Sequence, residues 1–344
     1  MDVVTVDFTS GRVPHERQLR VWLNFGEHGR ELLTTDVAVR LLDVLAGGPD
    51  AAAAFARGGR GSAASLRRTV FKVVPLENGG GRAKVEGGEL CLRKNGRGVD
   101  PNRNWDIHWG VKEKDYDPYE EAAGSAPFSE PESLLLRDAL AAWKPHAWVN
   151  VHSGMRALFM PFDHVAAMPG GPGGDAMRSM LEQLKRGHCP DCVTGGGGGS
   201  VGYLAHGTAT DYVYVNLSVP VAMTWEIYGD GAASNNDCFR MFNPLGREQH
   251  DALVDAWAAA CVAVPTVLTL HPDVPPDAVA WGRKGGQGTR VGSATDRAWL
   301  GWVASSAVLV ALLAAAATTS SAAVKRWRLQ RQDGPGVAVT KQMV

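Results

Sequence analysis

The sequence predicts an α/β protein in which helices pack around one β-sheet. Two short apolar runs, residues 147–152 and 219–227, are bounded by chain breakers, as buried strands are. Two longer segments, residues 31–45 and 251–268, carry apolar side chains at helical spacing. Because strands and helices alternate along the chain, a sheet with helices around it is the arrangement that buries both.

The N-terminal half supplies the other elements. Residues 3–8 and 20–25 alternate apolar and polar side chains around a turn with glycine and proline, which predicts a β-hairpin. The helix over residues 31–45 ends at a pair of glycines, and residues 69–75 are typical of a buried strand. A serine followed by acids opens a helix over residues 133–143, because a capping side chain and negative charge both stabilise a helix N-terminus.

The composition changes after residue 271. Residues 272–298 are rich in proline, glycine and charge, which is typical of a linker. Residues 299–324 contain no Asp, Glu, Lys or Arg, and about 20 apolar residues suffice to cross a bilayer. Basic residues follow, so the positive-inside rule predicts a transmembrane helix, a cytoplasmic tail over residues 325–344, and a lumenal or extracellular domain. The alternative is a buried or amphipathic C-terminal helix.

Charge and cysteine content narrow the function classes. A formal net charge of -1 does not favour nucleic acid as a partner. The single Cys-x-x-Cys pair cannot complete a structural zinc site, because no second pair accompanies it. In an oxidising compartment we expect one or two disulfides, of open connectivity, among Cys91, Cys189, Cys192 and Cys238.

The most informative polar residues are His28, Glu31 and His152. A His and a Glu three residues apart at the start of a helix project from the same face. A distant His can then close a three-ligand zinc site with one open position. Roughly one His-x-x-acid match is expected by chance in a chain of this composition, so the pattern needs support from other motifs. Glu226 ends an apolar strand, where a carboxylate is costly unless a metal or cation compensates it.

Further motifs make residues 3–270 similar to the zinc metallocarboxypeptidases of the carboxypeptidase A/B type, in particular to plant and algal membrane-anchored members. The matching motifs are HGRE (28–31), CLRK (91–94), GVDPNRNW (98–105), PFSEPE (127–132), HSG (152–154), YLAHGTATD (203–211) and TWE (224–226). The resemblance implies a catalytic domain over residues 1–271, with a mixed twisted sheet flanked by helices on both faces. Family members usually have a further strand and helix before this point, and a signal peptide is not present, so we expect an incomplete N-terminus.

The resemblance also implies a role for each matching residue. One Zn²⁺ per chain would be held by His28, Glu31 and His152, with a water in the fourth position. Glu226 would take the proton of that water, and Arg93 would stabilise the oxyanion that develops. The remaining implied roles are substrate docking by Arg30, binding of the terminal carboxylate by Asn102 and Arg103, closure over the bound residue by Tyr203, and orientation of His28 by Asp100.

Substrate specificity depends on two pocket positions. At Thr210, the basic-specific pancreatic type carries an acid and this chain does not. At Asp163, eleven residues after His152, the prohormone-processing branch also carries an acid. Because a buried Asp would pair with a basic side chain, the predicted function is removal of a single C-terminal Arg or Lys from peptides or proteins. A loop-capping role is the alternative for Asp163.

Other functions remain open on this scaffold. A carboxypeptidase of neutral or hydrophobic specificity and a catalytically silent peptide-binding module are the main alternatives. All three expected zinc ligands and Glu226 are retained, which disfavours the silent module. A deglutamylase would need a basic residue in the pocket and a cytosolic location, so Asp163 and the predicted membrane span disfavour it. The glycine run over residues 195–199 is interpreted as a tolerated surface insertion rather than a hinge.

Overall fold

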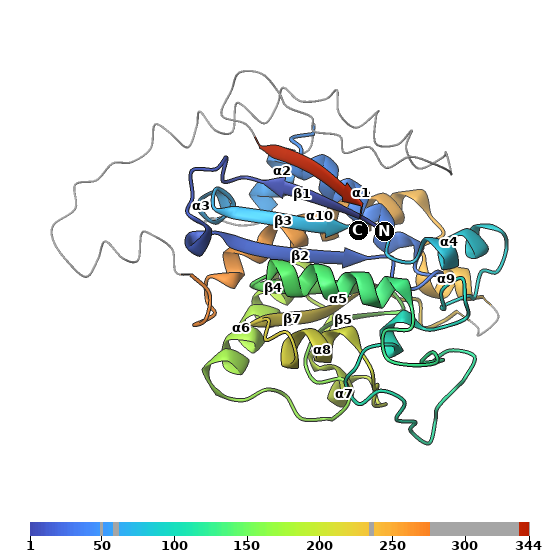
Figure 1. Ribbon diagram of the computed structural model, residues 1–344. Coiled ribbons are helices and arrows are strands. Elements are labelled where there is room, and N and C mark those ends of the chain that lie inside the picture. Colours follow the sequence, from blue (N-terminus) through green and yellow to red (C-terminus); the bar gives the residue numbers. More distant parts are fainter. Residues whose placement is uncertain (49–50, 58–61, 234–236, 276–336, 344) are drawn as a thin grey trace, which may run out of the picture.

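The computed structural model describes residues 1–48, 51–57, 62–233, 237–275 and 337–343. They form an eight-stranded mixed sheet with the order β6-β5-β7-β4-β2-β3-β1-β8. Helices cover both of its faces (Figure 1). The predicted fold class, a mixed sheet with helices on both sides, is therefore confirmed.

The middle of the sheet is parallel. Its four strands are β3 (Thr69–Val74), β2 (Leu19–Phe25), β4 (Ala147–His152) and β7 (Val221–Tyr228). Helices cover both sides of these strands, which explains their almost continuous apolar sequences. Outside them lie β5 (Met155–Met160), antiparallel to β7, then β6 (Val193–Gly196), and on the other side β1 (Asp2–Asp7), antiparallel to β3.

The predicted hairpin over residues 3–8 and 20–25 is wrong, although both segments are strands. β3 lies between β1 and β2, antiparallel to the first and parallel to the second. Alternation of side chains identifies a half-buried strand but not its partner. The partner of β1 comes from a segment about 65 residues further along the chain.

Two apolar clusters lie on the two faces of the sheet. On one face, α1 (Leu32–Leu45), α6 (Gly171–His188) and α10 (Arg247–Leu268) pack together, with α2 (Ala51–Arg57) and α3 (Ser62–Leu66) against α10. The other face is covered by α5 (Pro131–Trp143) and α8 (Ala209–Val215). Val21 and Leu23 belong to the first cluster, and Trp22 to the second, as alternation along a strand requires.

Short helices connect these elements: η1 (His15–Arg17), α4 (Gly79–Glu86), η2 (Pro101–Arg103), α7 (Gly197–Ser200) and α9 (Cys238–Phe242). The glycine run over residues 195–199 belongs to β6 and α7, so its interpretation as a surface insertion is wrong. Gly197 and Gly198 are buried, and a Cβ at Gly197 would overlap the carboxylate of Asp163. Close packing therefore requires glycine at this position.

The C-terminal segment departs from the predicted tail. Residues 338–343 form β8 (Ala338–Met343), which pairs antiparallel with β1 from Asp2↔Met343 to Asp7↔Ala338. Lys341 Nζ lies 2.7 Å from Asp2 Oδ2, and the two ends of the chain lie side by side (Figure 1). This part of the predicted tail is corrected: it supplies the hydrogen-bonding partner that the edge of β1 would otherwise lack.

The rest of the predicted C-terminal organisation falls largely outside the described residues. Val274 packs into the first apolar cluster, so the packed domain extends past residue 271. The remainder of the predicted linker and the predicted membrane span, residues 299–324, lie among residues that are not described. Within the described part, the segment Cys238–Leu268 is apolar enough to cross a membrane, but 67% of its most apolar window is buried inside the domain.

Candidate active site

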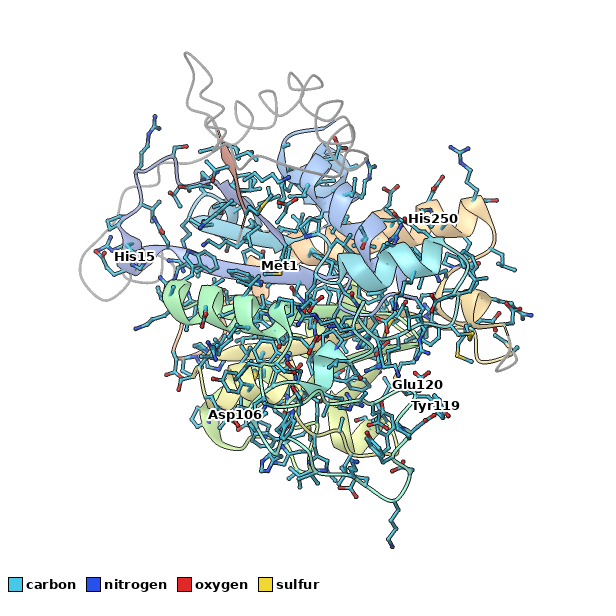
Figure 2. The ribbon with its side chains drawn as sticks, turned by 45° about the vertical axis from the view of Figure 1, so that its right-hand side comes forward. Met1, His15, Asp106, Tyr119, Glu120 and His250 are labelled. Atoms are coloured by element: carbon cyan, nitrogen blue, oxygen red, sulfur yellow. A yellow bond between two sulfur atoms is a disulfide. The ribbon has the colours of Figure 1, made fainter. Side chains whose placement is uncertain are left out.

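The carboxyl ends of the parallel strands bring polar side chains to one edge of the sheet. β2 leads into His28, β4 ends at His152, and Glu226 on β7 lies opposite His152 in the strand register. His15, before the start of β2, and Glu120, which contacts the loop after it, lie on opposite sides of the molecule (Figure 2). Open α/β sheets bind ligands outside the carboxyl ends of their strands, so the parallel order fixes the place of the site.

His28, Glu31 and His152 bring three ligand groups together. His28 Nδ1 lies 2.6 Å from Glu31 Oε1, and His152 Nδ1 lies 3.1 Å from Glu31 Oε2. The two Nδ1 atoms are 3.1 Å apart. Two nitrogens that each lie about 2.0–2.1 Å from a tetrahedral zinc are roughly 3.3 Å apart. The set therefore fits zinc, and each histidine would bind it through Nδ1.

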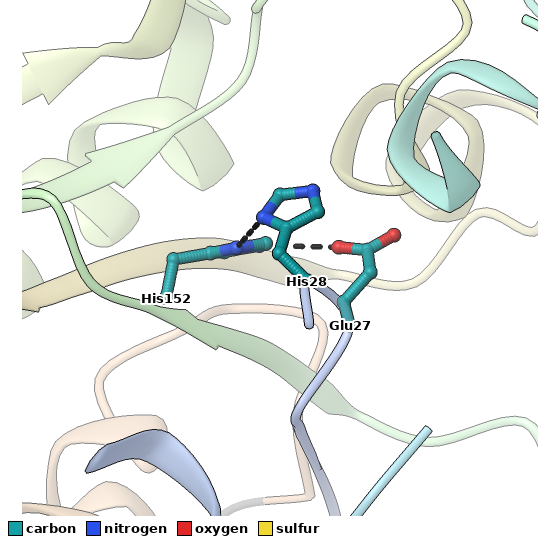
Figure 3. Close-up of side chains that lie close together, drawn as sticks. All are labelled: Glu27, His28 and His152. Atoms are coloured by element: carbon teal, nitrogen blue, oxygen red, sulfur yellow. Dashed lines mark hydrogen bonds and ion pairs between the residues drawn. The ribbon is translucent and has the colours of Figure 1, made fainter. Parts of the chain in front are cut away.

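Glu27 is a site residue that the sequence motifs do not reveal. Ligand atoms of Glu27, His28 and His152 also lie within 4.8 Å of one another (Figure 3). Glu27 Oε2, however, lies 3.2 Å from Nε2 of His152, whereas Glu31 is met by Nδ1 of that ring. Asn150 Nδ2 donates to the same oxygen at 2.6 Å. Glu27 thus occupies the place of a carboxylate that orients a metal-binding histidine, not that of a ligand.

Asp100 connects His28 to two arginines and is fully buried. Its Oδ1 lies 3.3 Å from His28 Nε2, and its Oδ2 accepts a 2.8 Å hydrogen bond from Arg93 Nε. Arg103 Nη1 lies 3.9 Å from the same Oδ2. Burial would raise the pKa of Asp100, but the charge of Arg93 outweighs this effect and holds that pKa well below its usual range. The ionised Asp100 therefore fixes the position of both guanidinium groups.

Asn102 and Arg103 lie in η2, next to Asp100. Asn102 Oδ1 accepts a hydrogen bond from the backbone N–H of Ala209 at 2.9 Å, which leaves its NH₂ group to donate elsewhere. Arg103 Nε pairs with Glu121 Oε2 at 3.0 Å. This pair of donors, amide and guanidinium, has the chemistry needed to bind a carboxylate.

A cleft of about 500 Å³ collects most of the expected site residues. Those that line it are His28, Arg93, Asn102, Arg103, His152, Asp163, Tyr203 and Glu226. Glu31 and Asp100 contact these residues without lining the cleft. Arg30 does not line it either: its guanidinium pairs with Glu120 at 2.6 Å and lies over the Phe242 ring. Thr210 is also outside, but its hydroxyl shares a 2.6 Å hydrogen bond with Thr224, which lines the cleft.

Two carboxylates of the cleft have raised pKa values. Burial, and then the charge of Glu31, raise the pKa of Glu226 to about 7 in the absence of a metal. Burial, and then the charge of Asp211, raise the pKa of Asp163 to about 7 as well. Glu226 Oε2 is buried and has no hydrogen-bond partner among the described residues. Perturbed carboxylates in a cleft are typical of functional sites, and this oxygen is free to accept a proton.

Comparison with known proteins agrees with this geometry. The model of the family described as zinc carboxypeptidase matches residues 1–252. Zinc carboxypeptidase A 1 of Anopheles gambiae is 28% identical over 174 residues, which are 46% of this chain and 38% of that protein. Carboxypeptidase A2 of Mus musculus is 27% identical over 233 residues, 61% of this chain and 51% of that protein. The chain thus spans about half the length, or less, of these curated relatives.

Solved structures share the fold at low sequence identity. Carboxypeptidase A from Helicoverpa armigera superposes with a TM-score of 0.61 at 19% identity, covering 77% of this chain and 64% of that one. Bovine thrombin-activatable fibrinolysis inhibitor, in complex with tick carboxypeptidase inhibitor, gives a TM-score of 0.58 at 18% identity, covering 77% and 84%. The arrangement of sheet and helices is therefore that of a known class of structures.

Proposed function

Because this chain belongs to the zinc carboxypeptidase family, we propose that it removes a single residue from the C-terminus of a peptide or protein in a zinc-dependent reaction. One observation carries the proposal: the His28, Glu31 and His152 ligand groups converge at a cleft that Glu226 and Arg93 also line. Ligands, a proton acceptor and an oxyanion partner are the parts that metal-assisted hydrolysis needs.

Each residue at the cleft would have a separate role in hydrolysis. Zinc, held by His28, Glu31 and His152, would polarise the scissile carbonyl and lower the pKa of a water towards roughly 7. Glu226 would accept a proton from the water as the new C–O bond forms, and would return it to the leaving amine as the C–N bond breaks. Arg93, held by Asp100, would pair with the negative charge that develops on the carbonyl oxygen.

Restriction to chain ends would come from the donors next to Asp100. Asn102 and Arg103 would bind the terminal carboxylate, the guanidinium through two hydrogen bonds. Tyr203 lines the cleft but is 43% exposed, so its ring is free to close over a bound residue. An internal peptide bond has no carboxylate for this pair and would be a poor substrate.

The residue removed is proposed to be Arg or Lys, because Asp163 lines the cleft together with Arg103 and Thr224. Burial and the charge of Asp211 raise the pKa of Asp163, and the charge of Arg103 only partly offsets them. A basic substrate side chain would supply a further positive charge and favour the ionised carboxylate. If Asp163 instead stays protonated in the complex, the pocket is uncharged and an apolar residue is preferred. These two outcomes distinguish basic from neutral specificity.

The test is hydrolysis of matched peptides that differ only in a C-terminal Arg, Lys, Phe or Glu. We expect release of Arg and Lys, loss of release after chelation, and recovery when zinc is added back. Asp163→Asn should lower kcat/KM for Arg about 10–100-fold, and for Phe by less than about threefold, because only a basic side chain uses the carboxylate. Glu248→Gln, at an exposed position outside the cleft, is the matched control.

Two results would contradict parts of this proposal. Release of Phe in preference to Arg would keep the reaction but remove the role given to Asp163. A zinc-loaded, folded protein that hydrolyses none of the four peptides would favour the silent peptide-binding module on the same fold.

We propose a location outside the cytosol from the disulfides and from a possible glycosylation site. The cysteines pair as Cys91–Cys238 and Cys189–Cys192, while Cys261 is buried in α10. Such bonds persist in secreted or lumenal proteins and are reduced in the cytosol. Asn216, in the sequence Asn-Leu-Ser, is exposed at the end of α8, where a glycan could be attached. Loss of mass on endoglycosidase treatment of the expressed protein, absent in Asn216→Gln, would support a lumenal or extracellular domain.

A further inference from the structure

Three histidines from three different loops gather beside the cleft and have no part in the proposed hydrolysis. His108 follows η2, His164 follows β5 next to Asp163, and His206 lies between Tyr203 and α8. The rings of His108 and His164 stack with centroids 4.0 Å apart, and His206 lies 6.3 Å and 6.5 Å from them. These rings form the histidine cluster discussed below.

The three rings of the cluster lie close enough together to be compared with rings around one ion. When two imidazoles bind a tetrahedral zinc at about 2.0–2.1 Å, their ring centres lie roughly 5 Å apart. The three observed separations lie on both sides of that value: His108 and His164 are closer together than this, and His206 is farther from both. The ligand atoms are not yet gathered within 4.8 Å, as those of Glu27, His28 and His152 are, so at least one ring must turn.

Carboxylates fix the tautomers of two members of the cluster. Asp211 Oδ2 accepts a 2.5 Å hydrogen bond from His164 Nδ1, and Glu113 Oε1 accepts a 2.7 Å hydrogen bond from His206 Nε2. In a neutral imidazole with one N–H so engaged, the other nitrogen keeps a free lone pair. The free atoms are Nε2 of His164 and Nδ1 of His206. A carboxylate that holds the far nitrogen is the usual partner of a metal-binding histidine.

One buried nitrogen of the cluster has no hydrogen-bond partner among the described residues. His206 Nδ1 is buried and makes no hydrogen bond within the described part of the chain, and the side chain as a whole is 11% exposed. A buried acceptor left unpaired is unfavourable unless a ligand satisfies it. His206 also lines a second hollow, of about 330 Å³, next to the first. An ion bound at His206 would satisfy this nitrogen.

His108 supplies the adjustable ligand. Its side chain is exposed and carries no side-chain hydrogen bond among those of the described residues, so its ring can rotate. Burial lowers the pKa of His108, and His164 and His206 lower it further whenever they are protonated. The ring is therefore neutral near pH 7, which is the form that binds metals.

We propose that His108, His164 and His206 bind a second zinc ion, separate from the ion held by His28, Glu31 and His152. Three imidazoles with an open fourth position suit Zn²⁺ and, less selectively, Cu²⁺ or Ni²⁺. The second ion would join the loop that carries Asp163 to the loop that carries Tyr203, since His164 is one residue from Asp163 and His206 is three residues from Tyr203. Occupancy would then restrict the closure of Tyr203 over a substrate.

The test counts bound metal rather than activity. The full chain is stripped with chelator, equilibrated with zinc, desalted and analysed for metal per chain, with binding followed by calorimetry. We expect two ions per chain in the original protein and one in His108→Asn. By calorimetry, the second ion should bind with a Kd at least tenfold higher in the variant than in the original protein. His250→Gln should retain two: His250 is also paired with a carboxylate, Asp36, and lies far from Asp106 and the loop of His108 (Figure 2).

One further variant keeps the proposal falsifiable. His206→Gln should also lose the second ion, and because His108 is exposed, His108→Asn decides the question even if His206→Gln fails to fold. A single ion in the original protein, or two ions in the His108→Asn variant, would overturn the proposal. Neither metal count tests the hydrolytic reaction itself, which depends on the first ion, so the two proposals fail separately.

Discussion

Glu226 lies opposite His152 in the sheet but is not among the three ligand groups that converge on zinc. Its part in proton transfer is therefore separable from metal binding. We expect Glu226→Gln to lower kcat for a C-terminal Arg peptide by a factor of about 10²–10⁴, the usual contribution of a general base. Zinc content, measured on the same samples, should be unchanged. A variant that lost its zinc would instead make Glu226 part of the metal site.

The acid limb of the pH profile belongs to the same residue. Burial and the charge of Glu31 raise the pKa of Glu226 to about 7 without metal. Bound zinc offsets the charge of Glu31, so the pKa in the active protein should fall below that value. A proton acceptor must be ionised, and kcat/KM should therefore fall about tenfold per pH unit below this pKa. Rates that stay level from pH 8 to pH 5, with zinc retained throughout, would contradict the assignment.

At the scale of single residues, the sequence predicts the metal ligands better than the residues that orient them. His28, Glu31 and His152 can be identified because their spacing and motifs are local. Glu27 cannot, because its role depends on Asn150 and His152 from β4, more than 120 residues away. The cluster of His108, His164 and His206 is equally invisible, since three loops bring it together.

The two disulfides make a contrast at the scale of elements. Cys91–Cys238 joins residues 147 apart and ties the segment before Arg93 to α9, whereas Cys189–Cys192 closes a loop with a separation of 3. Loop-closure entropy gives about 5 kcal/mol for the long loop and about 1–2 kcal/mol for the short one. We expect Cys91→Ser with Cys238→Ser to lower the free energy of unfolding by about 3–5 kcal/mol in denaturant titrations.

The matched double variant, Cys189→Ser with Cys192→Ser, should lose no more than about 2 kcal/mol. Equal losses in the two pairs would mean that closing the chain is not what the long disulfide contributes. Hydrolytic activity gives a second readout for loss of the Cys91–Cys238 disulfide, because Cys91 lies two residues before Arg93.

Most elements of the fold follow from the sequence, and the failures share one cause. β2, β4, β7, α1 and α10 are recognised from apolar runs and helical spacing, within a few residues of their observed bounds. The partner of β1 is not recognised, because β3 lies between β1 and β2 in the sheet and strand pairing is a long-range property. β8 also escapes notice, because its pairing with β1 is equally long-range and its exposed residues carry little apolar pattern.

For the whole molecule, the pairing of β8 with β1 can be tested directly. Thr5 and Thr340 are partners in the register, so their Cβ atoms point to the same face. We expect Thr5→Cys with Thr340→Cys to form a disulfide under mild oxidation, detected by peptide mass spectrometry. Thr5→Cys with Lys341→Cys is the matched control, because neighbouring side chains of a strand point to opposite faces. No crosslink in the first pair would show that β8 leaves the sheet in solution.

The β1–β8 pairing also limits how many times the chain between these strands can cross a membrane. Val274 is packed in the core and residue 338 is hydrogen-bonded to β1, so both ends of the intervening segment lie in the same aqueous compartment. A chain that starts and finishes on one side of a bilayer crosses it an even number of times, or not at all. The predicted single crossing with a cytoplasmic tail therefore requires β8 to be unpaired. A reporter fused after residue 344 would share the compartment of the cleft whenever the crosslink forms.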